Sequence, residues 1–182
     1  ASDVYKRQEK DTFDVSLLLT NRYHDFAHHN KKNPLEELFF ILCSVRTNKA
    51  GYHNTYQAFR KQFPRFEMVA EVSAEYIAKP LAAGGLANQK SIAIKKSIDI
   101  IAERFGRPTL APLQEMTDGE CEQFLTSLPG VGKKVARCVM MYSLDRQVFP
   151  VDSHCWRICR RLGWVRRTTK EQKPSPKDMD RL

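Results

Sequence analysis

The chain has 182 residues and a mass of 21.0 kDa, enough for one core or two small lobes and too little for three domains. With 42% hydrophobic and 28% charged residues but only 8 glycines and 9 prolines, it is not collagen-like or of low complexity. Its longest strongly apolar run, from Leu38 to Cys43, is far shorter than the roughly 20 residues of a membrane span.

The chain shows no signal peptide, and its cysteine count, five, is odd. Both features favour a reducing compartment, so we expect an intracellular protein, in the cytoplasm or nucleoid of a prokaryote or the nucleus of a eukaryote. No pair of cysteines has the C-x-x-C spacing of common zinc and iron–sulfur sites. We therefore expect no metal in this chain.

Positive charge is concentrated toward the C-terminus. The formal net charge is +9, and residues 128–171 contain ten basic side chains against three acidic ones. This excess favours a polyanionic partner, which charge alone does not resolve into nucleic acid or an anionic membrane surface. A solvated basic face is the alternative.

The first two thirds of the chain is predicted to be helical. Asn33 and Pro34 supply an N-cap and a first-turn proline. Ser73 caps a short helix that ends at the glycine pair 84–85, and Asn88 caps a longer one that ends at Gly106. The longer helix carries an apolar stripe at helical spacing, formed by Ile94, Ile98, Ile101 and Phe105.

The last third continues the helical pattern. Thr117 or Asp118 caps a helix that reaches Leu128, and a tight turn at residues 129–132 leads into another helix. Residues 144–151 form a loop, after which Asp152 or Ser153 caps a final helix. Since no segment alternates like a half-buried strand, the sequence predicts an all-α fold.

The most informative segment is 128–136, which reads L-P-G-V-G-K-K-V-A. It is not a dinucleotide-binding fingerprint, because the third glycine and the preceding strand are missing. It is not an ATPase-type P-loop either, because Ser127 replaces a glycine and Lys134 stands where a magnesium-binding Ser or Thr belongs. What remains is a glycine turn between two helices.

Such a turn can bind phosphate. Gly130 and Gly132 permit a sharp turn and a close approach, and the N–H groups that begin the next helix attract an anion. Lys133 and Arg137 add positive charge on one face of that helix. A DNA phosphate is the expected ligand, and an ordinary helical hairpin with glycines for geometry is the alternative.

This segment and the residues downstream of it resemble the helix-hairpin-helix (HhH-GPD) DNA glycosylase superfamily, most closely its endonuclease III branch. In that family the second lysine of the hairpin, here Lys134, is the catalytic nucleophile. Val151-Asp152-Ser153-His154 resembles the family's V-D-T-H, whose aspartate is the second catalytic residue. Eighteen residues separate Lys134 from Asp152, as expected for that branch. His154 could orient the aspartate or contact a phosphate.

Two upstream segments resemble DNA-inserting loops of the same branch. Gly85 to Lys90 is similar to the family's G-L-x-N-x-K, whose leucine, here Leu86, wedges into the base stack. Ile41 to Thr47 is similar to L-L-S-x-Q-x-T, with Arg46 in place of the glutamine that fills the gap left by the flipped base. Leu86 as a hydrophobic loop anchor and Arg46 as a phosphate contact are the alternatives.

The resemblance implies a base-excision-repair enzyme. A lysine nucleophile implies a glycosylase that is also an abasic-site lyase, acting on double-stranded DNA that holds a damaged base or an abasic site. We expect an oxidised pyrimidine as the base and a monomeric protein. An oxidised-guanine glycosylase is one alternative, because residues 134–138 and Trp156 resemble that branch too. A non-catalytic helix-hairpin-helix module is another, and a basic membrane-surface helix a more distant one.

The implied architecture is a two-lobed all-α fold with a central DNA cleft. Residues 1–8 read as a non-native scar, and 9–33 as an N-terminal helix that packs with the second lobe. Residues 34–146 would form a helical barrel with the helix-hairpin-helix at 118–144, and 147–182 a partial second lobe truncated at its C-terminus. Relatives carry a 4Fe-4S cluster on later cysteines, so a cluster is expected only in a full-length form.

Overall fold

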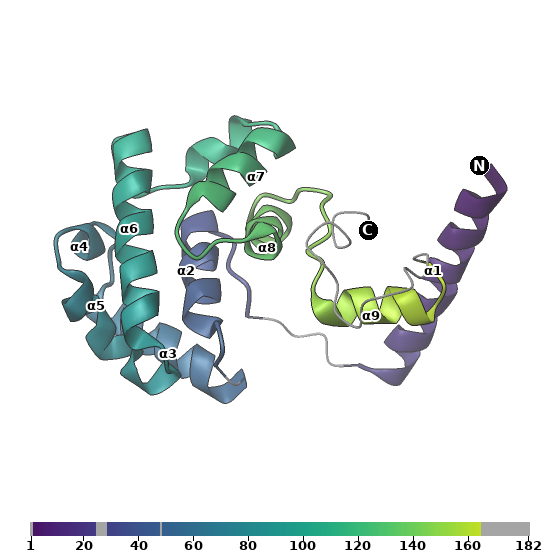
Figure 1. Cartoon of the computed structure of the whole chain (residues 1–182), viewed down its shortest axis with the longest axis horizontal. Helices are drawn as coiled ribbons and strands as arrows, with labels where there is room; N and C mark the ends of the chain where they lie inside the picture. Colours follow the sequence, from purple (N-terminus) through teal and green to yellow (C-terminus); the bar gives the residue numbers. More distant parts are fainter. Residues whose placement is uncertain (1, 25–28, 48, 165–182) are drawn as a thin grey trace, which may run out of the picture. The chain divides into compact units, whose positions relative to one another are not determined.

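The computed structural model describes residues 2–24, 29–47 and 49–164 (Figure 1). All regular elements in these ranges are helices, which confirms the predicted all-α class for this part of the chain. In chain order the elements are α1 (Ser2–Arg22), α2 (Pro34–Ser44), α3 (Lys49–Gln62), α4 (Glu67–Ala70), α5 (Ala74–Leu81), η1 (Ala82–Gly84), α6 (Ala87–Phe105), η2 (Ala111–Glu115), α7 (Asp118–Ser127), α8 (Lys133–Ser143) and α9 (Ser153–Arg161), where η marks a 3-10 helix. None of the described helices has the length and apolar character needed to cross a membrane.

The chain divides into two compact units. One comprises Asn30–Pro150, and the other joins Ala1–His29 to Val151–Leu182. The boundary at residue 150 lies slightly beyond the predicted one at 146. Residues 1, 25–28 and 165–182, which belong to the predicted scar, N-terminal helix and truncated second lobe, lie outside the described residues.

The core of the Asn30–Pro150 unit is organised around α2. This helix contacts α3, α6 and α8, and Figure 1 shows it between α6 and α8. Its sequence is apolar on nearly every side, so Leu38, Phe39 and Cys43 are all fully buried. Phe39 packs edge-to-face on Phe59 of α3, with ring centroids 6.2 Å apart. A helix buried all round is a rigid platform for the segments attached to its ends.

Most of the predicted helix boundaries are confirmed. The Asn33 side chain caps α2 by accepting from the N–H groups of Leu35 and Glu36. Thr117, rather than Asp118, caps α7, in a capping box with Glu120. Gly106 ends α6 with a φ of 73°.

One cap was predicted wrongly. Asn88 does not cap α6, because the helix begins at Ala87 and Leu86 occupies the N-cap position without a side-chain hydrogen bond. The carbonyl of Leu86 accepts the first hydrogen bond of the helix, from the N–H of Lys90 at 2.9 Å. Helix α3 was not predicted from the sequence, because the segment is rich in polar residues.

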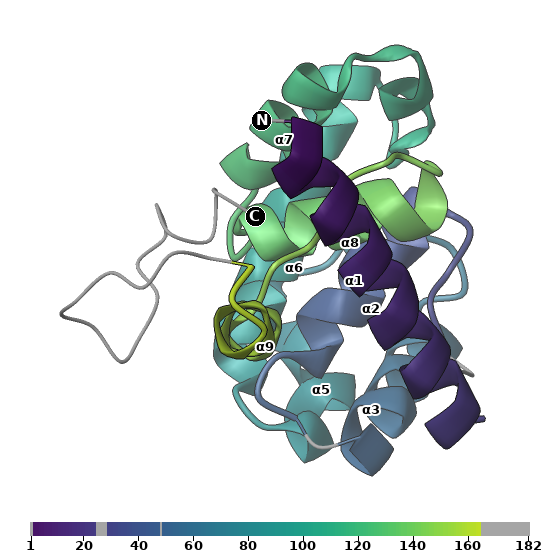
Figure 2. The same cartoon turned by 90° about the vertical axis from the view of Figure 1, so that its right-hand side faces the viewer.

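The second unit has two described helices, α1 and α9. Several large apolar side chains of α1 are exposed, among them Phe13, Leu17 and Leu18. Asp152 caps α9, which buries Trp156 and Cys159 and is viewed along its axis in Figure 2.

Candidate active site

The glycine turn between α7 and α8 has a defined geometry. The N–H of Val131 donates to the carbonyl of Leu128 at 3.1 Å, and Gly130 has a φ of 79°. With Pro129 before this glycine, the four residues form a type II turn, which requires a positive φ at its third position. Leu128 and Val131 are buried and fix both ends of the turn. The predicted helix, glycine turn and helix are therefore present as a rigid unit.

Helix α8 starts without a side-chain cap. Its N-cap residue is Gly132, which has no side chain, whereas α2, α5, α7 and α9 are all capped by a side chain. Lys133 and Lys134 are the first two residues of α8, and both are exposed. An uncapped N-terminus with two lysines is a favourable place for a phosphate group.

Arg137, the other predicted phosphate contact, has an ion-pair partner within the hairpin. Its Nε donates to the Glu122 carboxylate at 2.7 Å, and both side chains are about three-quarters buried. This ion pair joins α8 to α7 and holds the two helices of the hairpin together.

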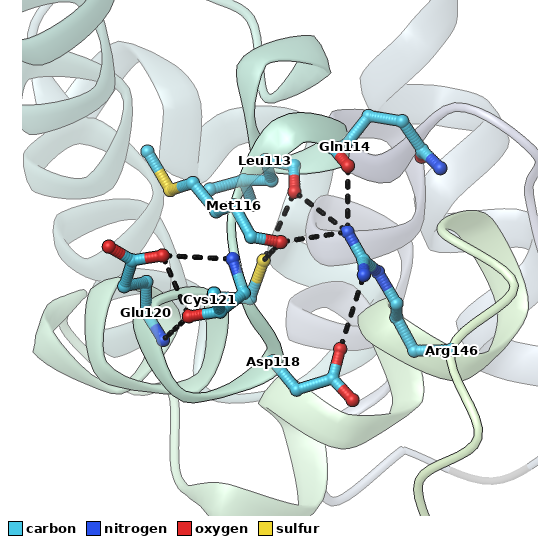
Figure 3. A network of polar contacts seen from close by, with 8 residues as sticks. Leu113, Gln114, Met116, Asp118, Glu120, Cys121 and Arg146 are labelled. Atoms are coloured by element: carbon cyan, nitrogen blue, oxygen red, sulfur yellow. Dashed lines mark hydrogen bonds and ion pairs between the residues drawn. The ribbon is translucent and has the colours of Figure 1, made fainter.

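A second arginine, Arg146, connects the segment after α8 to the start of α7 (Figure 3). One guanidinium nitrogen of Arg146 donates to the carbonyls of Gln114 at 2.7 Å and Met116 at 2.9 Å, and the other lies 3.3 Å from the Asp118 carboxylate. The acceptors lie at the end of η2 and the start of α7, while Arg146 follows α8. The basic excess of this region is thus partly structural, which charge counting could not show.

One face of α8 carries Lys134, Cys138 and Tyr142, spaced four residues apart. Burial, followed by Cys138 and the Glu37 carboxylate, raises the pKa of Tyr142, while Lys134 opposes the rise. These groups are therefore close enough to interact electrostatically, and they form a polar surface on α8 beside α2.

Glu37 is a fully buried carboxylate that was not predicted from the sequence. It accepts from the Asn30 side chain at 2.5 Å and from the backbone N–H of Lys31 at 2.6 Å, which anchors the segment before α2. The sequence does carry one indication of this burial. Glu37 lies in a helix that is otherwise apolar on nearly all sides, so few positions of that helix can face solvent.

Asp152, the predicted second catalytic residue, is the N-cap of α9. Its Oδ1 accepts from the backbone N–H groups of His154 and Cys155, each at 2.9 Å. His154 is exposed, and its Nδ1 lies 3.2 Å from the Arg157 guanidinium. Asp152 belongs to a different unit from Lys134.

Arg46 and Leu86, the predicted filler and wedge, share an unusual backbone conformation. Both are exposed, and they have φ values of 51° and 53°. Among the described residues, only Asp145 is another non-glycine residue with a positive φ. Such conformations are rare for side-chain-bearing residues and are frequent at functional sites.

The cysteines offer no site for a metal cluster. Cys43, Cys121, Cys138, Cys155 and Cys159 carry free thiols. No group of three or more potential metal ligands occurs in the ranges that the structure describes. The arrangement of these residues therefore does not fit a 4Fe-4S cluster.

An all-helical fold with a glycine hairpin, an uncapped lysine-bearing helix start and an aspartate-capped helix defines a helix-hairpin-helix protein. The family of HhH-GPD superfamily base excision DNA repair proteins matches residues 41–180. The chain belongs to this family.

Its similarity to known proteins supports this assignment. It is 30% identical over 143 residues to a protein of Arabidopsis thaliana named as a DNA glycosylase, covering 79% of this chain and 49% of that protein. It is 29% identical over 148 residues to Endonuclease III of Thermotoga maritima, covering 80% of this chain and 64% of that protein. The chain thus spans about half to two thirds of these relatives.

Solved structures agree on the fold. The structure of a thermostable thymine-DNA glycosylase superposes with a TM-score of 0.69 at 22% identity, covering 84% of this chain and 68% of that one. At that identity the likeness establishes the fold alone.

Proposed function

We propose that this protein is a bifunctional DNA glycosylase and abasic-site lyase that uses Lys134 as its nucleophile. The observation that carries the proposal is the position of Lys134, an exposed lysine in the first turn of α8, directly after the glycine turn. A phosphate bound at the helix start would bring the DNA backbone next to this amine. Membership of the family and the similarity to Endonuclease III support the same function.

The reaction needs Lys134 in its neutral form, because only a neutral amine has an electron pair to donate. Nζ attacks the anomeric carbon of the damaged nucleotide, and the glycosidic bond breaks with its electron pair leaving on the base, which takes up a proton. Ring opening gives a Schiff base between the sugar and Lys134. Loss of a proton from the adjacent carbon then expels the 3′ phosphate, water releases the lysine, and the strand is cut.

Asp152 is proposed to stabilise the positive charge that develops on the sugar and to accept the proton of the attacking amine. Its Oδ1 already receives two backbone N–H groups at the start of α9, so the carboxylate is held in one orientation. A fixed negative group needs little reorganisation when charge develops beside it.

Double-stranded DNA is the proposed partner. We propose that the protein binds it as a monomer. The glycines of the turn allow a close approach of the backbone, and Lys133 beside them is exposed. The proposed substrate base is an oxidised pyrimidine, by analogy with Endonuclease III. Cys138, on the same face of α8 as Lys134, favours oxidised guanine as a second candidate, because the oxidised-guanine branch has a similar K-V-A-x-C segment.

Borohydride trapping on duplex DNA with one abasic site tests the proposal. The wild-type chain should give a covalent protein–DNA band, and Lys134→Gln should give none. Lys133→Gln is the matched control, because it removes the neighbouring amine. At protein concentrations that saturate the DNA despite the lost phosphate contact, it should keep the band.

Asp152→Asn should slow trapping on the order of 100-fold or more while the chain stays folded, because asparagine is an equally good N-cap. If the wild-type chain binds DNA without forming the band, the result would favour the alternative function, a non-catalytic DNA-binding module. A band in Lys134→Gln would place the nucleophile elsewhere.

A further inference from the structure

Lys90 is a buried lysine to which the proposed chemistry gives no role. It lies in the first turn of α6, four residues after Leu86, and only 5% of its surface is exposed. Lysine is rarely buried to this extent, because its charge is costly to remove from water unless it is well partnered. The groups around Lys90 therefore indicate the role of its positive charge.

The ammonium of Lys90 donates three hydrogen bonds. The acceptors are the carbonyl of Cys43 at 2.8 Å, the Thr47 hydroxyl at 2.7 Å and the carbonyl of Gly84 at 2.9 Å. An ammonium group has three donors, so all of them are used. The Thr47 hydroxyl also donates to the Gly84 carbonyl at 2.6 Å, which closes the network.

All three acceptors are neutral. Burial lowers the pKa of the Lys90 ammonium, and the Cys43 thiol, whose own pKa is raised to about 12 by burial, opposes that change. A cation surrounded by two backbone carbonyls and a hydroxyl is well suited to hold together the segments that carry these groups.

The segments that Lys90 joins carry the two exposed, strained residues. Cys43 lies in the last turn of α2, and Thr47 directly follows Arg46. Gly84 ends η1, two residues before Leu86. The first segment precedes α3 and the second precedes α6, so Lys90 connects two turns that are forty residues apart in the sequence.

We propose that Lys90 is a positioning residue that holds Arg46 and Leu86 at a fixed spacing for insertion into the DNA stack. This inference rests on the proposed function, because it assigns both residues to the DNA interface. A wedge must resist the stacking force of the bases, and a loop free to move would yield to it. By tying both turns to α6, Lys90 makes the two side chains one rigid element.

The packing around Gly84 supports this assignment. A Cβ on Gly84 would lie 2.5 Å from the Thr55 hydroxyl oxygen of α3, so this backbone approaches α3 as closely as glycine allows. The backbone at Gly84, whose carbonyl Lys90 and Thr47 share, is thus also packed against α3.

Insertion can be measured without catalysis. The probe is duplex DNA with 2-aminopurine opposite a tetrahydrofuran abasic analogue, which has no aldehyde and cannot form a Schiff base. Filling the gap should unstack the 2-aminopurine and raise its fluorescence. The amplitude at saturating protein reports insertion, whereas the midpoint reports binding. A loss of folded protein would move the midpoint and leave the amplitude unchanged.

Lys90→Met keeps the length and apolar character of the side chain and removes its three donors. We expect its saturating amplitude to fall at least fivefold, as in the reference variant Leu86→Ala. Lys95→Met is the matched control: Lys95 lies on the same helix and also bonds to a backbone carbonyl, that of Ala70, yet contacts neither turn. It should keep the wild-type amplitude.

If Lys90→Met does not fold, Thr47→Val tests the inference instead. This variant removes the hydroxyl between Lys90 and Gly84 and keeps the buried lysine. Its amplitude should fall at least twofold. Full amplitude in both variants, or a wild-type chain with no fluorescence rise, would overturn the inference. Failure of the proposed function would show separately, as the absence of a trapped band with the wild-type chain on a natural abasic site.

Discussion

The hairpin turn at Gly130 and the paired turns at Arg46 and Leu86 are both sharp and both proposed to meet DNA, yet they are built in opposite ways. In the hairpin, the position with positive φ is a glycine, so that position carries no side chain. In the paired turns, residues with large side chains adopt φ values near 50° and buried hydrogen bonds hold them there.

This difference reflects what each turn offers to a ligand. A phosphate site uses backbone N–H groups, so glycine gives the geometry at no steric cost. A wedge or filler must present a side chain, so glycine is not an option and the left-handed conformation must be stabilised from outside. The strained, exposed side chains backed by a buried polar network are consistent with the insertion proposed for Arg46 and Leu86, and the relaxed glycine turn with the phosphate binding proposed for the hairpin.

Gly130→Ala should produce the largest effect on stability. A Cβ there would meet Ala93 and Leu42 at ordinary distances of 3.4 and 3.6 Å, so the cost comes from the φ of 79°. We expect a loss of about 1–2 kcal/mol in the free energy of unfolding, measured by chemical denaturation. Gly119→Ala, in a helix with open space around it, should be neutral or slightly stabilising. Equal effects for both would mean that the turn needs no glycine.

Lys133→Ala should change the salt dependence of DNA binding. Loss of one phosphate contact lowers the slope of log affinity against log salt by about 1. Arg137→Ala should change the slope less, because its guanidinium is paired with Glu122. Equal slopes for the two variants would show that Arg137 leaves this ion pair when DNA binds.

Leu86→Gly should have the smallest effect on stability and still abolish insertion. Glycine relieves the strain at φ 53°, and its greater freedom in the unfolded chain offsets that gain, so we expect a change within about 0.5 kcal/mol. The 2-aminopurine amplitude should fall as in Leu86→Ala. A loss of more than about 1.5 kcal/mol would instead identify Leu86 as a hydrophobic anchor of its loop.

Local patterns predicted much of this molecule. The caps at Asn33 and Thr117 and the stop at Gly106 depend on short-range chemistry that sequence displays directly. The L-P-G-V run likewise encodes its own turn, because proline and glycine occupy the two positions that a type II turn requires.

Features that depend on partners distant in the sequence were not predictable. Lys90 bonds to Cys43 across 47 residues, a contact that no local pattern displays. Arg137 was predicted to contact a phosphate, but its side chain is paired with Glu122 in the fold. Arg146, counted in the basic excess, is likewise paired with Asp118. The role of buried Glu37 was missed for a different reason: its partners, Asn30 and Lys31, are near in the sequence but lie outside the helix that contains it.

The most direct test of the proposed chemistry is to locate the covalent bond. The chain would be trapped on abasic-site DNA with borohydride and digested with protease and nuclease, and the modified peptide sequenced by mass spectrometry. We expect the reduced sugar adduct on Lys134. An adduct on Lys133 or on another amine, with Lys134 unmodified, would contradict the assignment of Lys134 as the nucleophile.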